Sequence, residues 1–385
     1  MVEASRADSL NMGIVGHHDL AGSGDGMHVN VVDGIAYVGH MGETRVGTSI
    51  LDVSDPRKPE LLTQIETPPG THSHKVQVVD DLLVVNYERN AREPDANTWQ
   101  AGMQTFDVSD PSQPVALGFL PTPGKGVHRV TFWEAPYVLM SASQNGFSDQ
   151  ILLIADVSDP SQPAEVGRWW VPGMHTSAGE IPSWDTSTAV YKAHHGIIRG
   201  NRAFVSWWDA GFVVLDISDI RSPRLVSHTS PDTPTSQTHT TLPVPGKDLL
   251  VVGEEATKDR CLELDRNIFL YDISDDRAPT LISTFPRPSH DFCSKGGRFG
   301  PHNIHEGRPG ALIDPDTVYV TYFNAGVRVF DISKPENPVE RGYCVPEPPP
   351  GRPAIQMNDL TVTTDGLIYA TDRFTGGLYV MEYTG

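Results

Sequence analysis

The sequence predicts an all-β protein in which seven four-stranded blades form a closed ring, the architecture called a β-propeller. Three observations support this prediction: a short phrase that recurs along the chain, a strand-and-turn pattern within each repeat, and termini that complement each other. Repeats of about 50 residues built only from short strands and turns are typical of propeller blades.

The recurring phrase reads LDVSDP, FDVSDP, ADVSDP, LDISD, YDISD and FDISKP. Its opening aspartates are 49 to 60 residues apart: Asp52, Asp107, Asp156, Asp216, Asp272 and Asp331. A degraded seventh copy, GLYVMEY, places Glu382 another 51 residues along. Each phrase ends an alternating strand and begins a turn, so we expect its Asp and Ser to cap turns rather than to do chemistry.

The termini account for the seventh blade. The last repeat ends after Glu382 without an outer strand, and the apolar segment 11–19 (NMGIVGHHD) has no partner within the first repeat. We therefore expect residues 11–19 to complete the C-terminal blade and close the ring, which removes free sheet edges. Seven such blades take up nearly the whole chain, so we expect one propeller domain over residues 1–385.

Composition narrows the partners. The net charge of −20 without a basic cluster argues against nucleic acid and against an anionic membrane surface, and no stretch is long and apolar enough to span a membrane. The N-terminus lacks a secretory pattern, so we expect a cytoplasmic protein. The three cysteines have no metal-binding spacing, although Cys261 and Cys293 could pair, since both lie in loops of adjacent repeats.

Histidine recurs where the inner strand of a blade is expected to begin, beside the central channel. Six of the seven repeats have it there: His28, His74, His128, His194 with His195, His239, and His302 with His305. The seventh has Asn358 and Asp359 instead. A closed ring would bring these positions together although they are far apart in sequence.

Converging imidazoles indicate a metal site, because neutral imidazole is the commonest ligand for transition metals. The predicted ligands, of which three or four would act at once, are His74, His128, His195, His239 and His305. The cofactor would be a divalent transition metal such as Zn, Fe, Mn or Cu. The alternative is a solvated channel in which the histidines bind nothing.

Other side chains are expected around the same mouth and resemble the lining of a small-molecule pocket. The predicted substrate contacts are His194, His302, Trp207, Tyr322, Asp359 and Arg373. Glu255 and Glu306 lie closest in sequence to the histidines. Either could act as a general base or could anchor the outer nitrogen of a ligand.

Several segments resemble the LVIVD-repeat family of bacterial β-propellers: the recurring phrase itself, GRWWVPGM from Gly167, AHHGI from Ala193, THTTLP from Thr238, GPHNIHEGRPG from Gly300 and NAGVRVFDIS from Asn324. The resemblance spans nearly the whole chain and implies the fold. It implies little about activity, since a fold does not determine function. Propeller lactonases hold Ca²⁺ with carboxylates and Asn, so the histidines here disfavour that cation.

These observations predict a metal-dependent enzyme that acts on a small organic substrate at the channel mouth, with hydrolase or lyase chemistry. A His-ligated Fe or Cu oxidoreductase would use the same ligands. A non-catalytic propeller that binds a protein partner through its loops is the third hypothesis, and it would have no need of bound metal.

Overall fold

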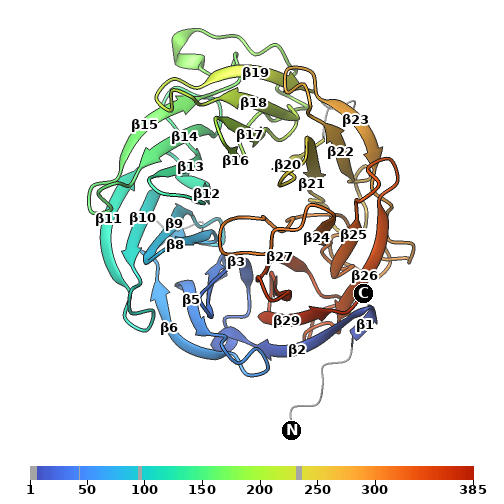
Figure 1. The fold of residues 1–385 in the computed structure, drawn as a ribbon. Coiled ribbons are helices and arrows are strands. Elements are labelled where there is room, and N and C mark those ends of the chain that lie inside the picture. Colours follow the sequence, from blue (N-terminus) through green and yellow to red (C-terminus); the bar gives the residue numbers. More distant parts are fainter. Residues whose placement is uncertain (1–6, 43, 94–97, 231–235) are drawn as a thin grey trace.

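The computed structural model describes residues 7–42, 44–93, 98–230 and 236–385, and these form seven antiparallel sheets arranged as a ring (Figure 1). Blade 1 consists of β3 (Gly26–Val32), β4 (Ile35–His40), β5 (Val46–Asp52) and β6 (Glu60–Glu66). Blade 2 consists of β7 (Thr71–His72), β8 (Val76–Val79), β9 (Leu82–Arg89), β10 (Gly102–Asp107) and β11 (Val115–Pro121). Blade 3 consists of β12 (Val127–Thr131), β13 (Tyr137–Ala142), β14 (Ile151–Asp156) and β15 (Ala164–Trp169). The predicted seven-bladed propeller is confirmed.

The remaining blades follow the same order. Blade 4 consists of β16 (His195–Arg199), β17 (Arg202–Ser206), β18 (Phe212–Asp216) and β19 (Arg224–Thr229), and blade 5 of β20 (Thr238–Pro243), β21 (Leu249–Glu254), β22 (Ile268–Asp272) and β23 (Thr280–Thr284). Blade 6 contains β24 (Thr317–Thr321), β25 (Val327–Asp331) and β26 (Val339–Pro346). Blade 7 contains β27 (Met357–Val362), β28 (Leu367–Asp372) and β29 (Leu378–Tyr383). Two short 3-10 turns, η1 (Leu20–Gly22) and η2 (Thr176–Ala178), lie in loops. Across the described residues, no helix has the length and apolar character needed to cross a membrane.

The N-terminal segment closes the ring as predicted. Strand β2 (Met12–His18) pairs antiparallel with β29, with Gly13 opposite Glu382 and His18 opposite Leu378. One feature was not predicted: β1 (Ala7–Leu10) pairs with β26 and extends the sixth blade. Strands β1 and β29, the first and last described strands, therefore lie on the same side of the ring (Figure 1).

The repeated Asp-Val-Ser turns are caps, as the sequence indicated. In each turn the aspartate accepts a hydrogen bond from the backbone N–H of the serine two residues later, at 2.9 Å for Asp52 and Ser54 and 2.7 Å for Asp272 and Ser274. The turns also fit against the neighbouring blade. A Cβ atom at Gly167 of β15 would overlap the carbonyl oxygen of Ile220 in the next turn.

Replacing Gly167 by alanine should therefore lower the free energy of unfolding by about 1–3 kcal/mol, the usual cost of overpacking. Denaturant unfolding would measure this loss. The matched control is Gly13→Ala in the outer strand β2, where a Cβ meets no atom within 4 Å. Equal stability of the two variants would contradict the proposed contact between blades.

The sixth blade departs from the others in a way that shapes the channel. Its inner segment is irregular and pairs with β24 through the isolated bridge Ile304–Val320, and the chain after it crosses the middle of the ring (orange in Figure 1). Glu306 reaches Arg129 of blade 3, at 2.9 Å. Glu306 and Arg308 are buried and border a cavity of about 10 Å³ there, so this segment occupies the channel.

Candidate metal centre

Six imidazoles form a continuous arc at one end of the channel, and we call them the histidine arc. Neighbouring ring centroids along it are 4.1 to 5.0 Å apart. In order around the ring, the members are His72, His74, His128, His194, His239 and His302. The arc thus joins five blades, and it contains His72, which the sequence analysis missed.

Three members of the arc have their Nδ1 atoms held by acceptors. His194 Nδ1 donates to the His239 carbonyl oxygen at 2.9 Å, and His302 Nδ1 donates to the Asn358 carbonyl oxygen at 2.5 Å. His128 Nδ1 donates to Glu88 Oε2 at 3.0 Å. Carbonyl and carboxylate oxygens only accept, so each Nδ1 carries the proton and each neutral ring presents a lone pair at Nε2. Metal-ligating histidines are oriented in this way in other proteins.

The Nε2 atoms of His128 and His194 lie only 3.2 Å apart. Two lone pairs at this distance repel each other unless a proton or a cation lies between them. Two imidazoles bound to one tetrahedral metal at about 2.0–2.1 Å would have their nitrogens about 3.3 Å apart. The pair therefore fits a shared metal ion.

The other end of the arc adds a carboxylate. Glu255 Oε1 lies 3.7 Å from His302 Nε2, and Glu255 Oε2 lies 3.9 Å from His239 Nε2. Potential ligand atoms of His194, His239 and Glu255 all lie within 4.8 Å of one another. Arg298 Nη1 donates to Glu255 Oε1 at 2.9 Å, which leaves Oε2 as the less engaged oxygen.

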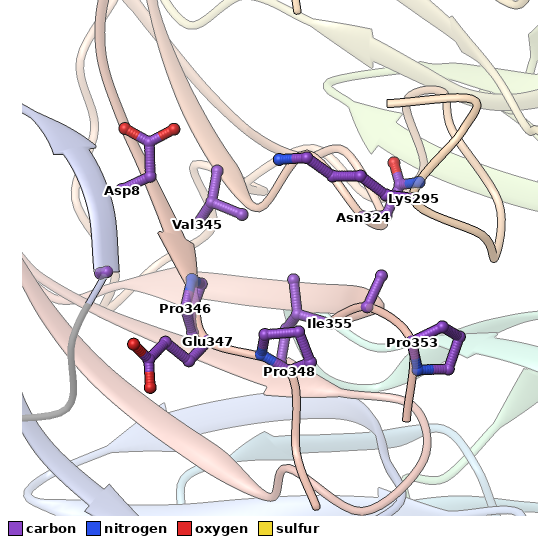
Figure 2. Close-up of a pocket in the computed structure, with 11 residues that line it drawn as sticks. Asp8, Lys295, Asn324, Val345, Pro346, Glu347, Pro348, Pro353 and Ile355 are labelled. Atoms are coloured by element: carbon purple, nitrogen blue, oxygen red, sulfur yellow. The ribbon is translucent and has the colours of Figure 1, made fainter. Parts of the chain in front are cut away.

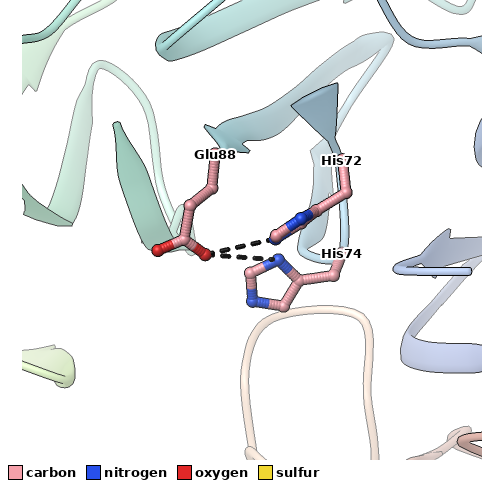
Figure 3. A group of neighbouring side chains, drawn as sticks. All are labelled: His72, His74 and Glu88. Atoms are coloured by element: carbon pink, nitrogen blue, oxygen red, sulfur yellow. Dashed lines mark hydrogen bonds and ion pairs between the residues drawn. The ribbon is translucent and has the colours of Figure 1, made fainter. Parts of the chain in front are cut away.

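Glu88 organises the beginning of the arc (Figure 3). Its Oε2 lies 3.2 Å from His72 Nε2 and 4.0 Å from His74 Nδ1, in addition to the bond from His128. Although burial raises the pKa of Glu88, His128 and His72 hold it well below its ordinary value. Glu88 is therefore an ionised anchor for these imidazoles.

His74 differs from the other members in its proton position. The Asn86 amide is oriented by the Lys75 N–H, which donates to Oδ1, and by the Val127 carbonyl oxygen, which accepts from Nδ2. Nδ2 therefore donates to His74 Nδ1, at 3.1 Å. The neutral ring then carries its proton on Nε2, which is buried without a hydrogen-bond partner.

Burial disfavours the charged form of four imidazoles in the arc. Burial lowers the pKa values of His74, His194, His239 and His302 well below 6.5, and neighbouring cationic groups lower them further. Neutral imidazole is the form that binds metals. The side chain of His128 is 24% exposed, so solvent reaches the arc at that point.

Two predicted ligands lie outside the arc. His195 is in the channel below it, with Nε2 3.1 Å from Glu306 Oε1. His305 donates from Nε2 to the Leu312 carbonyl oxygen and accepts the Val362 N–H at Nδ1, so both nitrogens are occupied. Of the predicted ligands, the arc therefore contains His74, His128 and His239. It also takes in His194 and His302, which were expected as substrate contacts.

A β-bulge separates neighbouring positions in two blades. In blades 3 and 5 the register shifts around His128 and His239, between residues that pair normally on either side. The bulged residue lies in the arc, and the residue after it, such as Arg129, lies one level down the channel. His194 and His195 take these two levels in blade 4.

The lower level is a buried polar network. Glu306 accepts hydrogen bonds from the Arg129 guanidinium and from Trp133 Nε1, each at 2.9 Å. These bonds hold its carboxylate at the lower level of the channel. Asp359 accepts the Val29 N–H at 2.7 Å, and burial raises its pKa to about 7 against the opposing effect of Lys75. Both residues therefore lie in the channel below the arc, and their predicted roles in catalysis and substrate binding stay predictions.

The predicted aromatic contacts are core residues. Trp207 is fully buried and donates from Nε1 to Met174 Sδ at 3.3 Å, and Tyr322 packs on Phe299. The next residue in each turn, Trp208 or Phe323, has positive φ and turns its ring toward the arc, 5.5 Å from His194 or 4.8 Å from His302. The matching sequences WWDAG and YFNAG were the only signal for this pair.

Long loops surround the arc. A disulfide joins Cys261 and Cys293, so it ties the loop after β21 to the loop that leads to His302. A separate cavity of about 400 Å³ lies between β1 and the loop before β27, lined by residues that include Asp8, Lys295 and Ile355 (Figure 2). None of the arc residues lines that cavity.

Comparison with known proteins agrees with the fold. The family model described as LVIVD repeat matches residues 23–67, 146–170, 193–230 and 316–345. No curated protein has a significantly similar sequence. Similar solved structures include a hypothetical selenium-binding protein from Sulfolobus tokodaii, with 14% identity and a TM-score of 0.62 over 92% of each chain.

A periplasmic gluconolactonase from Pseudomonas aeruginosa is similar as well, with 11% identity and a TM-score of 0.62 over 91% of this chain and 96% of that one. Identities this low show a shared fold alone. The matched segments fall in four of the seven blades of a closed ring. The chain is therefore a seven-bladed β-propeller, and segments in four of its blades match the LVIVD repeat.

Proposed function

We propose that the protein is a metal-dependent enzyme that binds one divalent transition metal through the Nε2 atoms of His128, His194, His239 and His302 and acts on a small organic substrate. The observation that carries this proposal is the 3.2 Å approach of two Nε2 atoms whose Nδ1 protons are both committed to oxygen acceptors. Imidazole-rich sites suit Zn, Fe, Cu or Ni better than Ca²⁺ or Mg²⁺.

The reaction class we propose is hydrolysis or elimination. When bound, the metal would supply Lewis acidity and would lower the pKa of a coordinated water. Glu255 Oε2, which is not engaged by Arg298, would accept a proton from water or substrate beside His239. Because the segment that contains Glu306 occupies the channel, substrate would enter from the face where His128 is exposed.

A redox reaction is the second candidate. Glu255, the carboxylate beside His239 and His302, forms an ion pair with Arg298. The metal could therefore be bound by neutral imidazole nitrogens alone. Such a set also suits Fe(II) or Cu, and the identity of the bound metal would separate the two reaction classes.

The test is elemental analysis of the protein purified without an affinity tag or chelator. We expect about one equivalent of transition metal per chain. Zn would favour hydrolysis or elimination, whereas Fe or Cu would favour a redox reaction. Protein without metal that also fails to take up added Zn, Fe, Mn or Cu tightly would refute the proposal and favour a non-catalytic propeller that binds a protein partner.

A further inference from the structure

Cationic side chains gather beside the histidine arc, although the chain as a whole has a net charge of −20. Arg298 and Arg373 both lie over the Phe323 ring, each with its guanidinium carbon 5.5 Å from the ring centroid. The same ring is 4.8 Å from His302. On the other side of the arc, Lys192 lies 4.3 Å over Trp208, which neighbours His194.

Arg373 is distinctive because the protein does not satisfy it. Its Nη1 atom is enclosed and has no hydrogen-bond partner, and no carboxylate among the described residues makes an ion pair with it. An enclosed donor without a partner costs about 1–3 kcal/mol, and more when it is charged. Burial and the nearby Arg298 lower its pKa to about 10, so it stays charged at neutral pH.

Neither neighbouring carboxylate is bonded to Arg373. Asp372 accepts the backbone N–H groups of Gln356, Phe374, Thr375 and Gly376 at 2.7 to 3.0 Å. Glu255 is bonded to Arg298 through Oε1 at 2.9 Å, so both carboxylates act on the pKa of Arg373 only through space. The enclosed Nη1 atom is therefore left for a group from outside the chain.

We infer that Arg373 binds the oxyanion of a small organic acid, a carboxylate or a phosphate, while Phe323 and Arg298 border the same position. The planar guanidinium suits such groups because it offers parallel N–H donors to two oxygens. This inference rests on the proposed function for the role of the ligand as substrate, and it places the anionic end of the substrate at the His302 end of the arc.

The test is a calorimetric titration of the purified full-length protein with three separate probes: acetate, inorganic phosphate and chloride. We expect acetate or phosphate to bind at least about tenfold more tightly than chloride, and the tighter of the two names the oxyanion. Arg373→Gln should weaken that binding at least about tenfold, as expected for loss of charged hydrogen bonds. Arg373→Lys, which keeps the charge but loses the planar fork, should give an intermediate affinity.

The matched control is Arg221→Gln, which removes the same charge from the Asp219-Ile220-Arg221 turn after β18, away from the arc, and should leave the affinity unchanged. His194→Gln separates this inference from the proposed function, since it should abolish metal binding and leave anion binding within about threefold. Unchanged affinity in Arg373→Gln, no preference over chloride, or loss of anion binding in His194→Gln would each overturn the inference.

Discussion

Replacing His194 by glutamine should abolish metal binding while leaving the ring folded. His194 contributes the Nε2 that lies 3.2 Å from His128 Nε2, and it lies between His128 and His239 in the arc. Removing a group that only hydrogen-bonds a metal ligand lowers metal affinity about 10–100-fold. Loss of the ligand itself should therefore lower the affinity by at least about 100-fold. Competition with a chromophoric chelator would measure the change.

The matched control is His228→Gln, because the His228 imidazole lies on the outer strand β19 and bonds the Ala210 carbonyl oxygen. This variant should bind metal like the wild-type protein. Thermal unfolding of both variants checks that the ring remains intact, as expected when each blade packs mainly on its neighbours. Equal metal affinity in His194→Gln and wild type would exclude His194 as a ligand.

Acid should destabilise the metal-free protein steeply below about pH 6.5. Burial lowers the pKa values of seven imidazoles, to about 4 for His195 and His305 and well below 6.5 for His28, His74, His194, His239 and His302. Between pH 6.5 and the folded-state pKa, the unfolded chain binds protons that the folded chain does not. The free energy of unfolding therefore keeps its full value above pH 6.5. It decreases as the pH falls, by up to about 1.4 kcal/mol per pH unit for each group.

Four carboxyls oppose this trend. Burial raises the pKa values of Asp359 and Glu254 to about 7 and also raises those of Asp209 and Asp372, so their protonation in the folded state adds stability as the pH falls. The seven imidazoles outnumber these four groups, and the sum remains a loss. The thermal midpoint, followed by circular dichroism, should fall by on the order of 10 °C between pH 7.5 and 5.5.

A control at high pH completes the experiment. Between pH 7.5 and 8.5 these imidazoles are neutral in both states, so their contribution to the midpoint should be constant there. Burial lowers the pKa of Lys75 to about 7, so any rise of the midpoint in this range comes from Lys75 and not from the imidazoles. A midpoint that does not fall between pH 7.5 and 5.5 would contradict the neutral, buried state of the arc.

The sequence alone determined the ring and its closure. The recurring Asp-Val-Ser phrase marks the same turn in successive blades, because an aspartate two residues before a backbone N–H caps that turn wherever the sequence recurs. The unpaired segment 11–19 was assigned correctly for an equally local reason, since the last blade lacked one strand. The extra pairing of β1 with β26 carried no such signal and went unpredicted.

Only the tertiary structure decided which side chains share the site. In blades 3 and 5 a bulge places one of two adjacent residues in the arc and the other in the channel. In blade 4, His194 lies in the arc and His195 in the channel, and the sequence AHHG gives no indication of which. The same holds for Trp207 and Trp208, where the second residue has a positive φ and its ring lies toward the arc. The periodicity of a strand determines only that neighbouring side chains point in opposite directions. The register against the next strand determines where each side chain points, and contacts between distant parts of the chain set that register.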